Sequence, residues 1–69
     1  PNFNNTLRRG DSGEDVKKMQ RQLSNKGYTL TIDGDFGPAT EAKVKQFQRN
    51  NRLVSDGICG RKTYGALFK

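Results

Sequence analysis

Residues 33–40 read Asp-Gly-Asp-Phe-Gly-Pro-Ala-Thr, and residues 56–63 read Asp-Gly-Ile-Cys-Gly-Arg-Lys-Thr. The Asp, both Gly and the Thr recur at the same places, 23 residues further along the chain. A fainter copy, Gly-Asp-Ser-Gly at residues 10–13, precedes the first helix that the sequence predicts. This reuse of one glycine-rich step predicts a compact all-α domain of three helices, built from repeated units of an Asp-Gly-x-x-Gly loop and a helix.

The two aspartates that open the loops suit a structural role. An Asp carboxylate can accept backbone N–H bonds across a turn, and Gly adopts backbone angles that other residues resist. We therefore expect Asp33 and Asp56 to hold their turns. The copies differ at the third and fourth positions, where the first copy carries Asp35 and Phe36, so a function of the loop is expected there.

The two long helices are predicted from their boundary signals. The first covers about residues 13–26, because Ser12 can cap it, acidic residues occupy its first turn and Gly27 follows it. The second runs from Pro38, a favoured first helical residue, to about residue 50.

A short third helix is predicted over residues 61–67. Residues 28–32 alternate apolar and polar side chains and predict an extended connector whose apolar side chains lie against the helices. The predicted inward faces of the two long helices comprise Val16, Met19, Leu23, Thr40, Val44 and Phe47, and the short third helix is expected to present Tyr64, Leu67 or Phe68 to the core.

The length of the chain, 69 residues, allows one domain with a thin core. Residues 1–6 are polar and are interpreted as the end of a linker, and residues 7–69 as the domain. Because the chain begins at Pro1, we interpret it as a piece of a longer protein. No apolar run approaches the ~20 residues that span a bilayer, so no membrane partner is expected.

The charged and reactive residues reduce the number of possible functions. A formal net charge of +6 favours anionic partners such as nucleic acid, acidic membrane surfaces or cell-wall polymers, and the charge alone does not choose among them. One Cys and no His exclude an internal disulfide, the usual His/Cys metal sets and the Ser-His and Cys-His catalytic pairs. We therefore expect a binding module without a metal or cofactor, and no enzyme.

Six segments, in order, carry a resemblance to a known family. They are residues 7–16 (Leu-Arg-Arg-Gly-Asp-Ser-Gly-Glu-Asp-Val), 19–23 (Met-Gln-Arg-Gln-Leu), 27–28, 33–40, 44–48 (Val-Lys-Gln-Phe-Gln) and 56–67. Together they resemble the peptidoglycan-binding domain found beside the catalytic domains of bacterial and phage cell-wall hydrolases. The resemblance implies a three-helix fold and a non-catalytic module that targets an attached hydrolase to the bacterial wall, outside the cell or within the wall.

The chain departs from that family pattern at three positions. Cys59 stands where an aliphatic residue is usual, which indicates a small buried hydrophobic role for it. Arg61 stands where Pro is frequent, and Tyr64 where an aromatic residue, often Trp, is expected. These departures indicate that the groove beside the third helix differs from that of its relatives.

The chemistry of peptidoglycan suggests which residues bind it. Sugar rings, amides and carboxylates call for an aromatic or apolar shelf, hydrogen-bonding groups and positive charge. The candidates are Tyr28, Phe36 and Tyr64 as platforms, Asp35, Gln46 and Gln48 as hydrogen-bonding groups, and Arg49 and Arg52 as carboxylate partners. Phe36 and Tyr64 alternatively belong to the core, and surface Gln and Arg alternatively serve only solvation.

Two other functions fit a basic three-helix domain. A nucleic-acid-binding role is supported by the net charge, but the basic residues are distributed over both long helices and do not mark one recognition helix. A protein-interaction or autoinhibitory role fits the same fold, since fold alone does not determine function.

Overall fold

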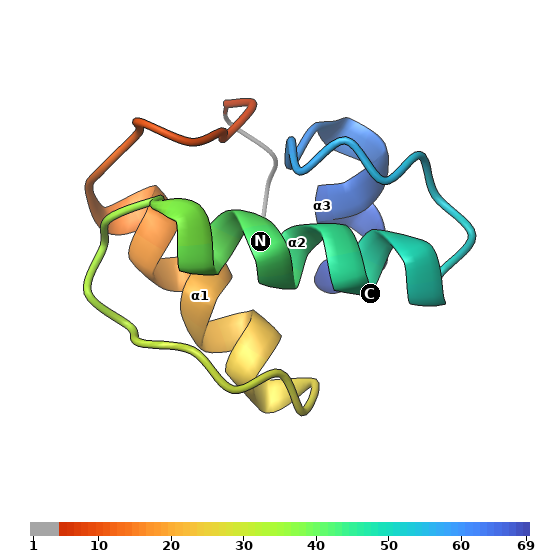
Figure 1. The fold of residues 1–69 in the computed structure, drawn as a ribbon, viewed down its shortest axis with the longest axis horizontal. Helices are drawn as coiled ribbons and strands as arrows, with labels where there is room; N and C mark the ends of the chain where they lie inside the picture. Colours follow the sequence, from red (N-terminus) through yellow and green to blue (C-terminus); the bar gives the residue numbers. More distant parts are fainter. Residues whose placement is uncertain (1–4) are drawn as a thin grey trace.

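Three helices joined by long loops make up the chain in a computed structural model that describes residues 5–69 (Figure 1). Helix α1 covers Glu14–Asn25, α2 covers Pro38–Asn50 and α3 covers Arg61–Leu67. The three predicted helices are confirmed, each to within one residue at its ends. None of the described helices is long and apolar enough to cross a membrane. Most of the predicted linker end lies outside the described residues.

The start of α1 differs from the sequence prediction in one respect. Glu14 and Asp15 occupy the first turn as expected, but Gly13 is the N-cap residue and no side chain caps the helix. Ser12 pairs instead with Asp35 in an isolated antiparallel bridge. The segment before α1 is therefore paired with the loop before α2, and its role is not limited to starting α1.

Both long helices end in a Schellman motif, in which two backbone N–H groups bond back to the last turn. After α1, Gly27 supplies the left-handed residue that the motif requires, with φ 100°. After α2, Leu53 donates to the carbonyl oxygen of Gln48 at 2.8 Å and Arg52 donates to that of Arg49 at 3.3 Å. Arg52 takes the left-handed position there with φ 60°, a conformation that costs a non-glycine residue free energy.

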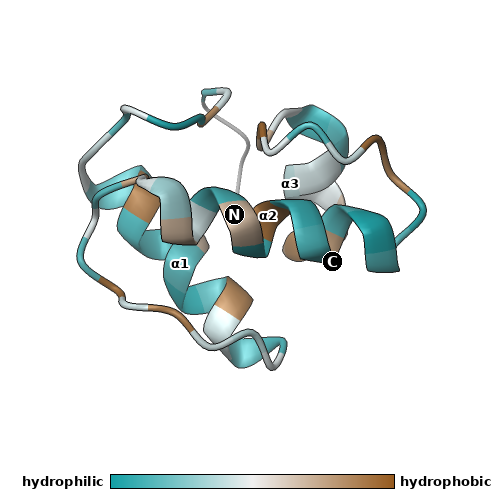
Figure 2. Cartoon of the chain, viewed as in Figure 1, coloured by the Kyte–Doolittle hydropathy of each residue, from teal (hydrophilic) through white to brown (hydrophobic). Residues whose placement is uncertain are grey.

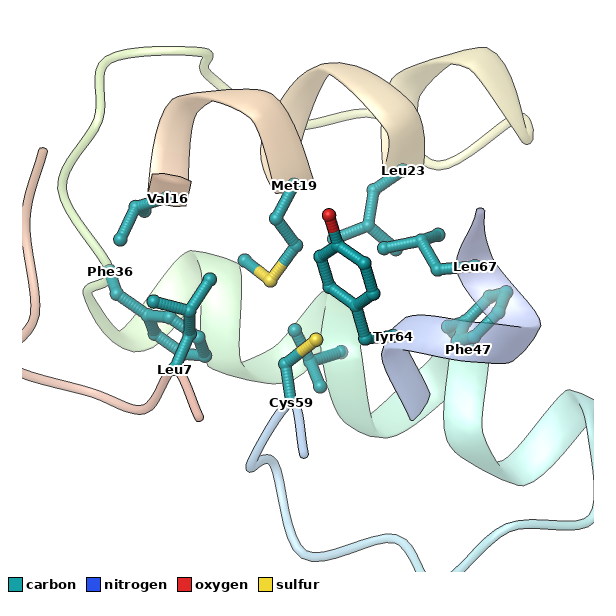
Figure 3. Close-up of a cluster of buried hydrophobic side chains, with 10 residues drawn as sticks. Leu7, Val16, Met19, Leu23, Phe36, Phe47, Cys59, Tyr64 and Leu67 are labelled. Carbon is teal, nitrogen blue, oxygen red and sulfur yellow. The ribbon is translucent and has the colours of Figure 1, made fainter. Parts of the chain in front are cut away.

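The hydrophobic core lies where the three helices meet, and Figure 3 shows its side chains converging from all of them. The predicted inward residues are buried, except Phe68, which packs in part against the core, so the helical faces are confirmed. Three further core residues, Leu7, Phe36 and Cys59, come from segments outside the helices. The core consists of Leu7, Val16, Met19, Leu23, Phe36, Val44, Phe47, Cys59, Tyr64 and Leu67.

Cys59 is fully buried, as its expected hydrophobic role requires. Burial raises the pKa of its thiol to about 12, so the thiol stays protonated at neutral pH. A buried, protonated thiol is a poor nucleophile and a poor metal ligand. Cys59 therefore contributes packing.

The connector between α1 and α2 packs only in part against the helices. Tyr28 and Leu30 are half-buried against the core, whereas Ile32 is 36% exposed. Figure 2 colours part of the loop that follows α2 as hydrophobic, at the outside of the molecule.

The segment before α1 braces both glycine-rich loops. Leu7 and Cys59 exchange two backbone hydrogen bonds, of 3.1 Å from the Leu7 N–H and 2.7 Å from the Cys59 N–H. Further along, the Gly10 N–H donates to the carbonyl oxygen of Phe36, and the Phe36 N–H donates to that of Asp11, both at 2.9 Å. The loops before α2 and α3 are thereby held in place by one stretch of chain (Figure 1).

Candidate functional site

A buried glutamine of α1 organises the loop that leads into α2. The Nε2 of Gln20 donates to Asp33 Oδ1 at 3.1 Å, to the carbonyl oxygen of Asp35 at 3.0 Å and to Thr40 Oγ1 at 3.0 Å. Its Oε1 accepts the N–H groups of Asp33 and Gly34, at 3.1 and 2.8 Å. Because Gln20 is 0% exposed, its amide serves only the chain itself.

A second buried glutamine, in α2, makes matching bonds to the loop that leads into α3. The Nε2 of Gln48 donates to Asp56 Oδ1 at 3.0 Å, to the carbonyl oxygen of Ile58 at 2.9 Å and to Thr63 Oγ1 at 3.0 Å. Its Oε1 accepts the Gly57 N–H at 2.9 Å. Gln48 was predicted to bind a ligand, but its amide is used by these partners and it is 1% exposed. We therefore assign it a structural role.

The aspartates that open the two loops hold their turns, as expected from the sequence. The Asp35 N–H donates to Asp33 Oδ1 at 2.9 Å, and the Ile58 N–H donates to Asp56 Oδ1 at 3.0 Å. These backbone bonds first, and the glutamine amides second, lower the pKa of both carboxyls below the ordinary 3.8. Both groups therefore remain carboxylates near neutral pH.

The two structural glutamines leave a signal in the sequence. Residues 16–21 read Val-Lys-Lys-Met-Gln-Arg and residues 44–49 read Val-Lys-Gln-Phe-Gln-Arg, so Gln20 and Gln48 occupy matching places. Gln20 was missed because a polar residue in an amphipathic helix is ordinarily assigned to the surface. Comparing the repeated loop together with this repeated helix segment would have identified Gln20 and Gln48 as a structural pair.

A shallow groove lies beside each loop. The N-terminal groove, about 230 Å³, is lined by Thr31, Asp33, Asp35 and residues 37–40. The C-terminal groove, about 320 Å³, is lined by Gln48, Leu53, Val54, Asp56, Ile58 and residues 60–63. Every lining residue of the first groove has a lining counterpart in the second, 23 residues further on. The two grooves are therefore lined by matching positions of the sequence that carry different side chains.

The side chains give the two grooves opposite chemistry. The N-terminal groove carries the carboxylates of Asp33 and Asp35 and no basic residue. The C-terminal groove places the apolar Val54 and Ile58 beside two basic residues of α3. Val54 is 79% exposed, an unusual placement for a large aliphatic side chain in a small domain.

The net charge of the chain lies entirely in its second part. Residues 1–41 contain six basic and six acidic residues, whereas residues 42–69 contain seven basic residues and the single acid Asp56. The C-terminal groove belongs to this positive part. Glu41 and Lys45 both lie over the same loop, because a Cβ on Gly57 would stand 2.8 Å from Glu41 Cγ and 3.1 Å from Lys45 Cε, and the two basic residues of the groove lining, Arg61 and Lys62, outnumber its one acid, Asp56. The C-terminal groove thus combines an apolar surface with a positive field.

A third hollow, about 470 Å³, lies between residues 5–7 and the start of α1, and Asp11, Glu14 and Asp15 line it. It is larger, but it is acidic and adjoins residues that the structure does not describe. Among residues 5–69 no group of three or more His, Cys, Asp or Glu side chains is placed to hold a metal ion. The C-terminal groove is the better candidate for an anionic ligand.

Two of the three predicted aromatic platforms are buried, and a ligand-binding role for the third, Tyr28, stays a prediction. Phe36 and Tyr64 are 2% and 9% exposed and lie in the core, which confirms the alternative interpretation of both (Figure 3). Tyr28 is half-buried, with its ring edge-on to Phe47 and its hydroxyl accepting the amide of Asn50 at 2.9 Å. The aromatic residues therefore mainly support the fold.

The other predicted residues are exposed but do not form one cluster. Asp35 lines the N-terminal groove, while Gln46 and Arg49 lie on the surface of α2. Arg52 immediately precedes Leu53, at the edge of the C-terminal groove. A ligand-binding role for these four residues stays a prediction.

Comparisons with known proteins show which family the chain is similar to. The family model described as "Putative peptidoglycan binding domain" matches residues 12–67. The chain is 40% identical, over 70 residues, to the zinc D-Ala-D-Ala carboxypeptidase of Streptomyces albus G, covering 97% of this chain and 28% of that protein. The structure of an endolysin of Burkholderia AP3 phage superposes with a TM-score of 0.90 at 49% identity, covering 91% of this chain and 24% of that one. The SleB N-terminal domain gives a TM-score of 0.91 at 40% identity, covering 96% and 92%.

The fold and these similarities define a class, the small three-helix domains carried by enzymes of the bacterial cell wall. Within that class, this chain belongs to the peptidoglycan-binding domain family. It spans about a quarter of the carboxypeptidase and of the endolysin, with 28% and 24% of their lengths.

Proposed function

We propose that the chain is the wall-targeting module of a peptidoglycan hydrolase and has no catalytic residues of its own. The match of the family over residues 12–67 carries the proposal. It is supported by similar domains in a carboxypeptidase and an endolysin. The sequence contains no His, and its one Cys is buried, so the usual nucleophile and base pairs are lacking.

In this proposal the wall ligand contacts the C-terminal groove and its border. Val54 and Ile58 supply an apolar shelf, and the basic residues of α3 supply cations for carboxylates. Arg49 and Arg52 extend the positive surface beyond the groove. Gln46 offers an exposed amide on α2, and Asp35 belongs to the opposite, acidic groove.

We further propose that the fold repeats one unit, made of a helix glutamine, an Asp-Gly-x-x-Gly loop and a threonine in the next helix. The matching bonds of Gln20 and Gln48, the positive φ of Gly34 and Gly57 (79° and 76°) and the paired groove linings support this. In such a repeat one copy can keep the scaffold while the other acquires a ligand surface.

The proposed mechanism is a raised local concentration. A weak module tethered to a hydrolase keeps the catalytic domain close to an insoluble polymer without altering its chemistry. The site of action would be outside the cell or within the wall. Deleting the module should lower activity on intact walls more than on small soluble substrates, and equal losses on both would contradict tethering.

Co-sedimentation with purified peptidoglycan sacculi tests the proposal directly. The chain should pellet with sacculi, both with and without attached teichoic acid. A salt-dependent DNA-binding assay on the same protein tests the nucleic-acid alternative. Failure to pellet with any sacculus would refute the proposal. Tight DNA binding without pelleting would favour a nucleic-acid-binding role.

A further inference from the structure

We infer that the C-terminal groove binds the free carboxylate end of a stem peptide, with the small apolar side chain of the terminal residue on the apolar shelf. This inference rests on the proposed function and assigns the part of peptidoglycan that the groove recognises. The observation behind it is the juxtaposition of Val54 and Ile58 with Arg61 and Lys62 in one groove of about 320 Å³.

The charge around the groove favours an anion. Seven of the eight charged side chains in residues 42–69 are basic. The one acid, Asp56, is an exposed carboxylate of the groove lining whose Oδ1 accepts hydrogen bonds from the Gln48 amide and the Ile58 N–H, and Arg61 and Lys62 outnumber it in that lining. Glu41 and Lys45, opposite in charge, both lie over Gly57, so the positive charge of the groove comes from Arg61 and Lys62 in its lining.

The apolar shelf distinguishes a peptide end from a phosphate polymer. A polyol phosphate chain is anionic but has no apolar side group to bury, whereas the end of a stem peptide has a methyl-bearing residue next to its carboxylate. Burying the 79%-exposed Val54 against such a methyl removes apolar surface from water. A volume at the lower end of the range for ligand sites also suits a small peptide end.

The N-terminal groove provides a control within the same molecule. Where the C-terminal groove has Val54 and Lys62, its counterpart has Thr31 and Ala39 at the matching positions of the sequence. Val54→Thr and Lys62→Ala therefore replace each residue by one that the matching position already carries. Both residues are exposed, so neither change should disturb the core.

The test is a titration followed by the backbone amide resonances of the ¹⁵N-labelled chain. The probes are N-acetyl-D-alanyl-D-alanine and the same dipeptide with an amidated C-terminus. The free acid should shift the resonances of residues 53–63 and bind about fivefold more tightly than the amide, because the two probes differ only in the charged group. Glycerol phosphate should bind more weakly than the acid.

The variants separate the two parts of the groove. Lys62→Ala should weaken binding of the acid about threefold and leave the amide unchanged, since it removes one partially solvated charge. Val54→Thr should weaken both probes alike. Lys26→Ala, which removes an exposed lysine at the end of α1, should leave both affinities as they are.

The outcomes also separate this inference from the proposed function. Equal binding of acid and amide, shifts confined to the N-terminal groove, or stronger binding of glycerol phosphate would each overturn the inference. If the chain nevertheless pellets with sacculi, the wall-targeting function stands and only the assigned ligand group is wrong. If it fails to pellet, the proposed function itself falls.

Discussion

Gln20 and Gln48 show how a polar residue can become the centre of a small fold. Each loop has no helix or strand in which its polar groups could pair with one another. The glutamine amide instead forms the hydrogen bonds that several backbone and side-chain groups of the loop would otherwise make with water. Among the described residues, no buried side-chain nitrogen or oxygen is left without a hydrogen bond. In a domain with so thin a core, these bonds determine the loop conformation as much as apolar packing does.

Replacing Gln48 by Leu should therefore cost about 3 kcal/mol of unfolding free energy, because several buried partners lose their bonds. Urea unfolding followed by circular dichroism measures the loss. Gln46→Leu, an exposed glutamine on the same helix, should change stability by no more than about 0.5 kcal/mol. Similar small losses in both variants would show that the buried amide is dispensable.

Acid should destabilise the fold through Asp33 and Asp56. Their pKa values are lower in the folded chain than the ordinary 3.8, so the unfolded chain binds protons first as the pH falls. Their contribution is complete well above pH 3.8 and is lost as the pH falls through the folded values. The urea midpoint should drop below about pH 4.

The double variant Asp33→Asn/Asp56→Asn should show a flatter pH profile, because its side chains no longer titrate. Asp35→Asn, in the same loop, is the control for loss of a carboxylate outside the two turn positions. A profile for the double variant as steep as that of the original chain would assign the acid sensitivity elsewhere.

The sequence predicts the roles of single residues where the partners are local, and misses them where the partners are distant. The turn-holding bonds of Asp33 and Asp56 follow from the local pattern, since donor and acceptor lie two residues apart. The burial of Gln48 and Phe36 depends on partners supplied by distant segments, such as Thr63 and Leu7. A polar side chain and a loop aromatic therefore resemble surface residues until the fold brings those partners together.

Among the helix ends, the end of α2 departs most from the backbone conformation that its residues prefer. Its Schellman motif needs a left-handed residue, and the chain uses Arg52 where α1 uses Gly27. The helix boundaries themselves were predictable, because Pro38 and Gly27 carry strong local signals. The groove beside the end of α2 was not, because it forms only when residues 53–63 fold against the helix.

Arg52→Gly should stabilise the fold by about 1 kcal/mol, because glycine adopts the left-handed conformation without steric cost. It should also weaken binding to sacculi, because it removes a cation beside the groove. Thermal unfolding and co-sedimentation of the same variant measure both effects. Gly27→Ala, the reverse change at the matching place in α1, should be destabilising without altering sacculus binding. A destabilised Arg52→Gly variant would contradict this account.

At the scale of the whole molecule, the chain is electrically divided. Residues 1–41 are neutral in sum, and residues 42–69 carry the full +6. This excess of positive charge in residues 42–69 favours an anionic polymer as partner, although the fold is held together mainly by apolar packing and buried hydrogen bonds. Composition gave the total charge, but its location relative to the groove required the structure.

Affinity for sacculi should accordingly fall with ionic strength. Raising the salt from about 50 to about 200 mM should weaken binding about threefold, since exposed charges are screened over distances of about 8–10 Å. Co-sedimentation at a series of salt concentrations measures this. The unfolding free energy should change little over the same range, and salt-independent binding would mean that the apolar shelf acts alone.

The paired hydrogen bonds between Leu7 and Cys59 give the module a defined route for mechanical load. Cys59 sits between Ile58 and Gly60, two residues that line the C-terminal groove. In a protein where a further domain precedes this one, tension on the linker reaches Leu7 and passes across the bridge to the groove loop. A module bound to the wall through the groove would then bear part of this tension across the two Leu7–Cys59 hydrogen bonds.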